Sequence, residues 1–325
     1  MRYFIYCLFI ACLLFGCKKQ SNEVYIFKVS LLVNDSHTDY AAFEYFNTIL
    51  KERSNNRLAL EIYHSEQLAK EIEAIRLIQA EVIDMTITGS LLNNWFETAA
   101  FCELPFFFKD TVEVKQFIKG DIGQLVEQEM IEKTALRPLC YFLRGPRQLT
   151  SNKPIKDPDD LNGLIVRVPN VPSFVTTWDA LGAKSTPMAF SEVFTSLQSG
   201  TVDAQENSLA LIKNAGFYEV QKYVNMTNHV LSWGYPVIGE KQFQKLPSEL
   251  QSILIEAAKD MQVFEHQLFL NHEKNIRKEL ENKGMQFISV NHEAFSKKCE
   301  QAIFESLSFE LQSIYKTLKS KKHLE

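Results

Sequence analysis

Glycine and proline are scarce in this sequence, with 12 and 10 residues among 325. Charged side chains make up 23% and hydrophobic ones 46%, a composition that excludes extensive disorder and low complexity. Positive charge is not in excess either, because 35 Lys and Arg stand against 40 Asp and Glu and the formal net charge is −5. The chain therefore lacks the basic footprint of a nucleic-acid-binding protein, while a local basic site for a small anion is compatible with this total. The length predicts about two globular domains.

Motifs of the common enzyme classes are also absent. The sequence contains no Gly-x-Ser-x-Gly elbow and no glycine-rich phosphate loop. His-Glu pairs at residues 272–273 and 292–293 each begin a zinc-protease pattern, but Ile276 and Ser296 stand where the second histidine belongs. An enzymatic function would then depend on a catalytic triad assembled in space, which no sequence pattern can exclude.

The cysteines show no metal-binding pattern. No Cys-x-x-Cys occurs, and Cys102, Cys140 and Cys299 lie far apart in the sequence, so we expect neither a metal site nor another cofactor. We expect these three side chains to be small buried hydrophobic groups. One disulfide among them is the alternative in an oxidising compartment.

The longest apolar run is at the N-terminus. Residues 4–15 are continuously apolar, which is too short for a membrane span of about 20 residues and typical of the hydrophobic region of a signal peptide. The run ends at residues 14–17, Leu-Phe-Gly-Cys, which are similar to a bacterial lipobox. Residues 1–17 are thus expected to be a lipoprotein signal peptide with Cys17 as the acylated residue. An uncleaved anchor and a plain secretory peptide are the alternatives, and each places the folded part outside the cytoplasm.

Beyond this segment, short β-type runs alternate with amphipathic helices, as in an α/β fold. In the N-terminal part the pattern predicts strands at residues 25–33, 58–62 and 82–88, with helices at 39–53 and 69–80 between them. This β-α-β-α-β order with short connections predicts a right-handed parallel sheet.

One long helix is predicted at residues 248–283. Its apolar residues recur at helical spacing, Ser248 and Gln251 have the form of a capping box, and Gly284 suits the first position after the helix. At 1.5 Å per residue the helix would be roughly 50 Å long, which is longer than one small domain is wide. We therefore expect it to brace two domains or to project from the molecule.

Several longer motifs follow in the middle of the chain. They comprise Arg-Gln-Leu-Thr-Ser-Asn-Lys-Pro-Ile at 147–155, Asp-Leu-Asn-Gly-Leu-Ile-Val-Arg-Val-Pro at 160–169, Thr-Pro-Met-Ala-Phe-Ser-Glu-Val at 186–193, Val-Asp-Ala-Gln-Glu-Asn at 202–207 and Phe-Tyr-Glu-Val-Gln-Lys-Tyr at 217–223. In this order they resemble the extracytoplasmic solute-binding proteins of tripartite ATP-independent periplasmic (TRAP) transporters, the DctP family. The resemblance extends over nearly the whole chain after residue 27.

The resemblance implies two interwoven α/β domains of the periplasmic-binding type, joined by hinge strands, with the long helix as a brace. Domain I is expected at residues 24–145 plus 233–272, and domain II at 146–232 plus 273–325. A protein of this family closes on its solute and delivers it to TRAP membrane permease subunits, whose transport is driven by an ion gradient. It catalyses no reaction itself.

The resemblance also assigns ligand-binding residues. Arg167 stands where the family's arginine pairs with a ligand carboxylate, and a planar guanidinium suits that role because it makes a bidentate fork. Asn207 stands at the family's ligand-facing asparagine, Arg147 at a second arginine near the carboxylate, and Phe190 at an aromatic residue of the cleft. The alternatives are a structural ion pair for either arginine, a turn cap for Asn207 and core packing for Phe190.

Two further aromatic residues, Trp233 and Tyr235, are expected either to form a stacking wall in the cleft or to pack at the hinge. The loop at residues 88–92 bears on the substrate, because Gly89 and Leu92 stand where sialic-acid-binding members carry a glutamate and an arginine. We therefore expect a smaller organic acid, namely a C4-dicarboxylate, a keto acid or a sugar acid. A sensory receptor that presents its ligand to a membrane signalling protein is the main alternative function, and an extracytoplasmic enzyme is another.

Overall fold

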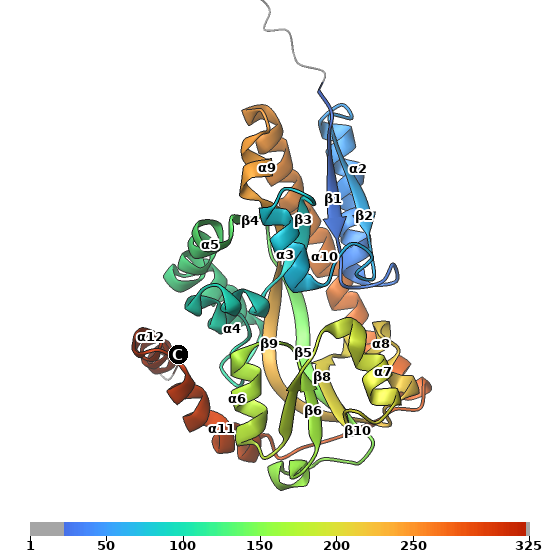
Figure 1. Ribbon diagram of the computed structural model, residues 1–325, viewed down its shortest axis with the longest axis vertical. Coiled ribbons are helices and arrows are strands. Elements are labelled where there is room, and N and C mark those ends of the chain that lie inside the picture. Colours follow the sequence, from blue (N-terminus) through green and yellow to red (C-terminus); the bar gives the residue numbers. More distant parts are fainter. Residues whose placement is uncertain (1–22, 323–325) are drawn as a thin grey trace, which may run out of the picture.

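A computed structural model describes residues 23–322 of the chain, with the side chains of 321 and 322 excepted. The expected signal peptide and Cys17 lie outside these residues. Within the described range, none of the helices combines the length and the hydropathy that a membrane crossing requires. The molecule consists of two α/β lobes that share long strands and one long helix (Figure 1).

The N-terminal β-α-β-α-β prediction is confirmed. Its elements are β1 (Tyr25–Ser30), α2 (Thr38–Arg53), β2 (Leu58–Tyr63), α3 (Glu71–Gln79) and β3 (Met85–Thr88). Strand β1 pairs in parallel with β2 on one side and with β3 on the other. We call the part built on β1, β2 and β3 the first lobe.

Helix α2 shows why these residues fold locally. The imidazole of His37 accepts a hydrogen bond from the backbone N–H of Asp39 and so caps the first turn. The apolar residues that recur at helical spacing, among them Phe43, Phe46 and Leu50, are fully buried against the sheet.

The first lobe continues into a helical layer and then into the long strands. These elements are α4 (Thr111–Lys119), α5 (Asp121–Thr134), β4 (Leu136–Pro138) and β5 (Phe142–Ser151). The second lobe follows as β6 (Ile165–Val168), α6 (Pro172–Ala180), β7 (Lys184–Pro187), α7 (Val193–Gln198), β8 (Ala204–Ser208), α8 (Leu209–Asn214) and β9 (Tyr223–Gly239). The chain ends with α9 (Glu240–Gln244), α10 (Ser248–Asn282), β10 (Gln286–Ile288), α11 (His292–Ser306) and α12 (Phe309–Lys322).

Strands β5 and β9 connect the lobes. The sheet order is β2-β1-β3-β9-β5-β8-β6-β7, so both strands stand at its centre, and Figure 1 shows them running from one lobe into the other. β9 pairs with β3 near its C-terminal end and with β5 along the rest of its length, antiparallel in both cases. The β5–β9 register shifts between Arg144 and Arg147, where Pro146 interrupts the ladder because it has no N–H group. This irregularity marks the place where the two lobes join.

The long helix is confirmed as α10, of 35 residues. It contacts α2 in the first lobe and α8 in the second, as a brace between lobes must. Gly284 has φ +96° and follows the C-cap, as predicted. The expected capping box is wrong, because Pro247 is the N-cap and the amide of Gln251 instead donates to the carbonyls of Phe243 and Leu246 in the preceding turn.

The interwoven course of the chain agrees with the expected architecture, while the domain boundaries at 145/146 and 232/233 stay a prediction. Both boundaries fall inside the shared strands β5 and β9. The two expected domains are also in contact away from these strands. Tyr315 of α12, in expected domain II, packs on Phe107 of expected domain I with ring centroids 5.2 Å apart. The C-terminal helices therefore touch both of the expected domains.

Candidate functional site

A cavity of about 980 Å³ lies between the two lobes. Its walls include the loop after β1 and helix α3 from the first lobe, and residues that follow β6, β7 and β8 from the second. The cavity is thus at the carboxyl ends of parallel strands, where α/β sheets commonly bind ligands. Its volume is at the upper end of the range for small-molecule sites.

Arg167 lies in this cavity as a buried cation that has no acidic partner in the described part of the chain. It is the third residue of β6 and only 3% of its surface is exposed. Its Nε and Nη2 donate to the carbonyl of Met188, at 3.0 and 2.6 Å. No carboxylate of the described residues comes within ion-pair distance. Burial lowers the pKa of Arg167 to about 10 because it disfavours the charged guanidinium. A negatively charged ligand in the cavity would stabilise this charge.

Arg147 also faces the cavity, but a carboxylate already neutralises it. Its Nε and Nη2 bind the two carboxylate oxygens of Glu206 at 2.5 and 2.8 Å, and Nη2 also reaches the Glu206 carbonyl at 2.9 Å. The register pairs Arg147 with Ser208, which makes Glu206 its diagonal neighbour on β8. Arg147 therefore forms the structural ion pair that was the alternative to its ligand-binding role.

His229 of β9 extends this pair into a buried network. Its Nε2 lies 2.9 Å from Oε2 of Glu206 and its Nδ1 lies 2.8 Å from the hydroxyl of Thr227. Because a carboxylate only accepts, Nε2 carries the proton and Nδ1 accepts from the threonine. Burial lowers the pKa of His229, so the ring is neutral. Burial would raise the pKa of Glu206, but Arg147 and the hydrogen bond from His229 hold it below the ordinary value.

Asn207 and Phe190 line the cavity as expected. The Asn207 side chain donates from Nδ2 to Gln205 at 3.4 Å, while its buried Oδ1 has no hydrogen-bond partner in the described structure. That oxygen is available to a ligand hydroxyl. Phe190 is half buried and meets Phe217 edge-on, with ring centroids 5.9 Å apart.

Trp233 and Tyr235 do not line the cavity. They therefore form no stacking wall for a ligand, and the alternative expectation, that they pack beside the hinge, applies instead. Both are completely buried. Being two residues apart on β9, they share one face of the strand, and that face is covered by Phe108 and by Phe117 of α4, with centroids 5.9 and 5.6 Å from Trp233. Trp233 and Tyr235 therefore belong to the core beside the shared strand.

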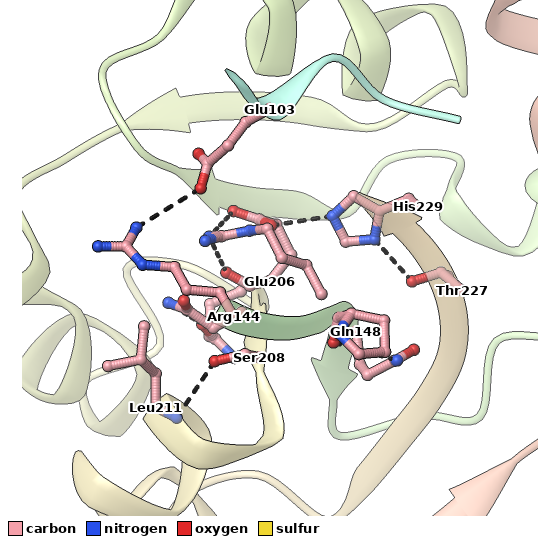
Figure 2. Close-up of polar contacts among 12 residues, drawn as sticks. Glu103, Arg144, Gln148, Glu206, Ser208, Leu211, Thr227 and His229 are labelled. Carbon is pink, nitrogen blue, oxygen red and sulfur yellow. Dashed lines mark hydrogen bonds and ion pairs between the residues drawn. The ribbon is translucent and has the colours of Figure 1, made fainter. Parts of the chain in front are cut away.

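The structure adds charged residues to the site that the motifs did not indicate. Arg144 of β5, Glu103 and Glu71 all line the cavity. Nη1 of Arg144 lies 3.6 Å from Oε1 of Glu103 (Figure 2). Burial raises the pKa of Glu71 to about 7, with Arg144 opposing the rise and Glu103 adding to it. The only sequence signal for this group is that Arg144 precedes Arg147 by three residues in the same strand.

Metal and thiol chemistry find no support in the described part of the chain. Residues 23–322 hold no group of three or more His, Cys, Asp or Glu side chains that could bind a metal ion. Cys102, Cys140 and Cys299 are free thiols, and burial raises the pKa of Cys299 to about 12, which keeps it protonated and unreactive.

Two α/β lobes that share hinge strands, with a buried guanidinium in the cavity between them, define a solute receptor of the periplasmic-binding type. The family model of the bacterial extracellular solute-binding proteins, family 7 (DctP), matches residues 29–310. The chain belongs to this family of TRAP solute-binding proteins. Members of the family are receptors and not enzymes, and they work outside the cytoplasm.

Individual relatives agree over nearly their full length. A solute-binding protein of Roseobacter denitrificans is 44% identical over 291 residues, which are 90% of this chain and 90% of that protein. A TRAP periplasmic solute-binding protein structure from the same species, with bound L-galactonate, has a TM-score of 0.89 and 43% identity and covers 91% of this chain and 99% of that one. Another from Haemophilus influenzae, with bound L-gulonate, has a TM-score of 0.84 and 32% identity and covers 91% and 98%.

Proposed function

We propose that the protein captures a sugar acid in the cavity between its lobes, pairs the acid's carboxylate with Arg167, and delivers it to a TRAP membrane permease. The observation that carries the proposal is the state of Arg167, a buried guanidinium bonded to one carbonyl and to no carboxylate of the described chain. A carboxylate bound there would satisfy the cation by a charge-assisted fork at a buried position.

The charge of the cavity favours a sugar acid over a dicarboxylate. Acidic side chains outnumber basic ones in the cavity wall. The acidic residues are Asp39, Glu66, Glu71, Glu73, Glu103 and Glu192, and the basic residues are Lys70, Arg76, Arg144, Arg147 and Arg167. Arg147 is neutralised by Glu206, and Lys70 pairs with Glu192. A second ligand carboxylate near Arg144 would meet Glu103, which already lies 3.6 Å from that cation, whereas hydroxyl groups could donate to the carboxylates. The relatives that hold L-galactonate and L-gulonate support the same class, the aldonates.

Closure of the lobes would complete the site. The shared strands β5 and β9 provide the hinge, and Lys70 at the start of α3 already reaches across the cleft to Glu192 of the second lobe. An exposed ion pair of this kind contributes little by itself. A bound acid that contacts both lobes would supply the larger part of the free energy that favours the closed form.

Thermal denaturation tests the ligand class. At a concentration one hundred times its Kd, an aldonate should stabilise the folded protein by about 2.7 kcal/mol, which raises Tm by about 4 °C in a chain of this size. We expect this result with L-galactonate or L-gulonate and a much smaller shift with succinate or malate at the same concentration. A larger shift with the dicarboxylates would contradict the proposed ligand class.

The anchor is a separate part of the proposal. We expect Cys17 to be the acylated first residue of the mature protein, which would hold the receptor at the membrane surface near its permease. Mass spectrometry of the mature protein should find a lipid-modified N-terminal peptide beginning at Cys17, and Cys17→Ser should release the protein from the membrane fraction. Recovery of unmodified Cys17 in a soluble protein would exclude the anchor and leave the binding function untouched.

A further inference from the structure

The cavity has a second charged region besides Arg167, which we call the Arg144 subsite and define as Arg144, Glu103 and Glu71. Arg144 extends from β5 toward Glu103 (Figure 2). The arginine side chain is 23% exposed and that of the glutamate 2%. Glu71 is the first residue of α3 in the first lobe. All three line the same cavity as Arg167.

Gly234 makes room for the Arg144 guanidinium, and Gly89 lies beside it. A Cβ atom at Gly234 of β9 would lie 2.9 Å from Nη2 of Arg144 and 2.9 Å from Ile87, so any side chain there would displace the arginine. A Cβ at Gly89, just after β3, would lie 3.9 Å from Nη1. Gly89 is the position that carries a glutamate in sialic-acid-binding members. Arg144 thus brings a charged group from another strand into the space that the loop at Gly89 leaves open.

The polar groups of this subsite have unused hydrogen-bonding capacity. Oε1 of Glu103 is buried and has no hydrogen-bond partner in the described structure, because its 3.6 Å separation from Arg144 is too long for a hydrogen bond. The Arg144 guanidinium makes no hydrogen bond within residues 23–322, but its side chain is 23% exposed. Buried polar atoms are normally paired, so Oε1 of Glu103 indicates a partner that enters through the cavity.

The Arg144 subsite and Arg167 mark two different ends of the site. Arg167 of β6 pairs with Gln205 of β8, and Gln205 pairs in turn with Thr150 of β5. Arg144 lies six residues before Thr150 on β5. Arg147, between these two positions on β5, pairs with Ser208 and lies between the ends. An elongated ligand with its carboxylate on Arg167 would therefore extend its other end toward Arg144.

We infer that Arg144, Glu103 and Glu71 bind the hydroxyl groups at the far end of an acyclic sugar acid and so select its chain length. The guanidinium donates to hydroxyl oxygens, and the carboxylate of Glu103 accepts from hydroxyl protons. A short acid reaches Arg167 alone, while a six-carbon aldonate reaches both ends. This inference depends on the proposed function, because it requires the carboxylate to be on Arg167.

Calorimetric titration with two acids tests the subsite. L-Galactonate has six carbons, and glycerate has the same carboxylate and 2-hydroxyl on three carbons. Arg144→Met should weaken L-galactonate binding about tenfold or more, because hydrogen bonds from a charged group are lost, and should change glycerate binding less than about twofold. Glu103→Gln, which preserves shape but removes the acceptor charge, should also act selectively on L-galactonate.

The matched control is Arg137→Met. Arg137 pairs with Glu240 at 2.6 and 2.8 Å outside the cavity wall and is 27% exposed, close to the exposure of Arg144, so its loss should alter neither affinity. If Arg144→Met fails to fold, Arg144→Lys retains a charge beside Glu103 and should still reduce L-galactonate binding selectively.

Equal weakening of both acids, or of neither, would overturn the subsite. Failure of the unaltered protein to bind any sugar acid would instead overturn the proposed function, so the two failures are distinguishable.

Discussion

Replacement of Arg167 by methionine should weaken L-galactonate binding by about thirtyfold or more, because removal of one partner from a buried charge pair costs about 2–5 kcal/mol. The same variant should fold as stably as the unaltered protein, or more so. Burial lowers the pKa of Arg167 to about 10 from its ordinary 12.5. Since both values lie above neutral pH, the group is charged in both states, and carrying the charge in the fold costs about 3 kcal/mol. Methionine removes that cost.

Calorimetric titration gives the affinity, and thermal denaturation without added ligand gives the stability. Arg167→Lys separates charge from geometry, because lysine keeps the cation and loses the bidentate fork; it should bind with intermediate affinity. A loss of affinity accompanied by a large fall in Tm would show a structural arginine and contradict the assignment of Arg167.

Arg147→Met should have the opposite effect and destabilise the protein by about 3–5 kcal/mol, a fall in Tm of about 5–8 °C for a chain of this size. Arg147 belongs to a fully buried network with Glu206 and His229. Without the arginine, Glu206 becomes a buried carboxylate with no cation to compensate it. Arg167→Met is the matched control, since it makes the same substitution at a similarly buried arginine in the same cavity.

The pH dependence gives this prediction a second measurement. In the unaltered protein the pKa of Glu206 is held below its ordinary 4.5, so its contribution to stability is present above that pH and is lost as pH falls through the lowered value. His229 has a lowered pKa, so the unfolded chain binds its proton first and stability declines below about pH 6.5.

In Arg147→Met the pKa of Glu206 should rise, because burial is no longer opposed by the arginine. The difference in Tm between the variant and the unaltered protein should therefore shrink as pH is lowered from 7 toward 4. A difference that stays constant over this range would show that the ion pair is not the source of the stability.

The sequence was sufficient for the elements whose signal is local. Helix α10 follows from apolar residues at helical spacing, and the parallel order of β1, β2 and β3 follows from short connections through helices. The prediction of a capping box at Ser248 was wrong because the amide of Gln251 donates to carbonyl groups in the preceding turn. Such competition depends on how the chain folds back on itself, which a short motif does not contain.

The site was predictable only as far as its motifs reach. The motifs placed Arg167 and Asn207 in the cavity wall. They did not show that Arg147 is neutralised by Glu206, because that ion pair depends on the antiparallel register of β5 and β8. Trp233 could not be placed because both faces of a central strand are covered, so strand periodicity alone does not say which face meets the cavity.

Arg144 was missed because the residues that surround its guanidinium are distant in the sequence. Its partner Glu103 lies in another segment. Gly234, which makes room for it, and Gly89, which lies beside it, are on two other parts of the chain. Only the assembled sheet brings these four positions together.

A crystal structure of the protein with L-galactonate tests the central claim most directly. The account predicts both carboxylate oxygens of the ligand within about 3 Å of the Arg167 guanidinium, with the hydroxyl chain extending toward Arg144. A carboxylate bound to Arg144 instead, with Arg167 still bonded only to the carbonyl of Met188, would contradict it.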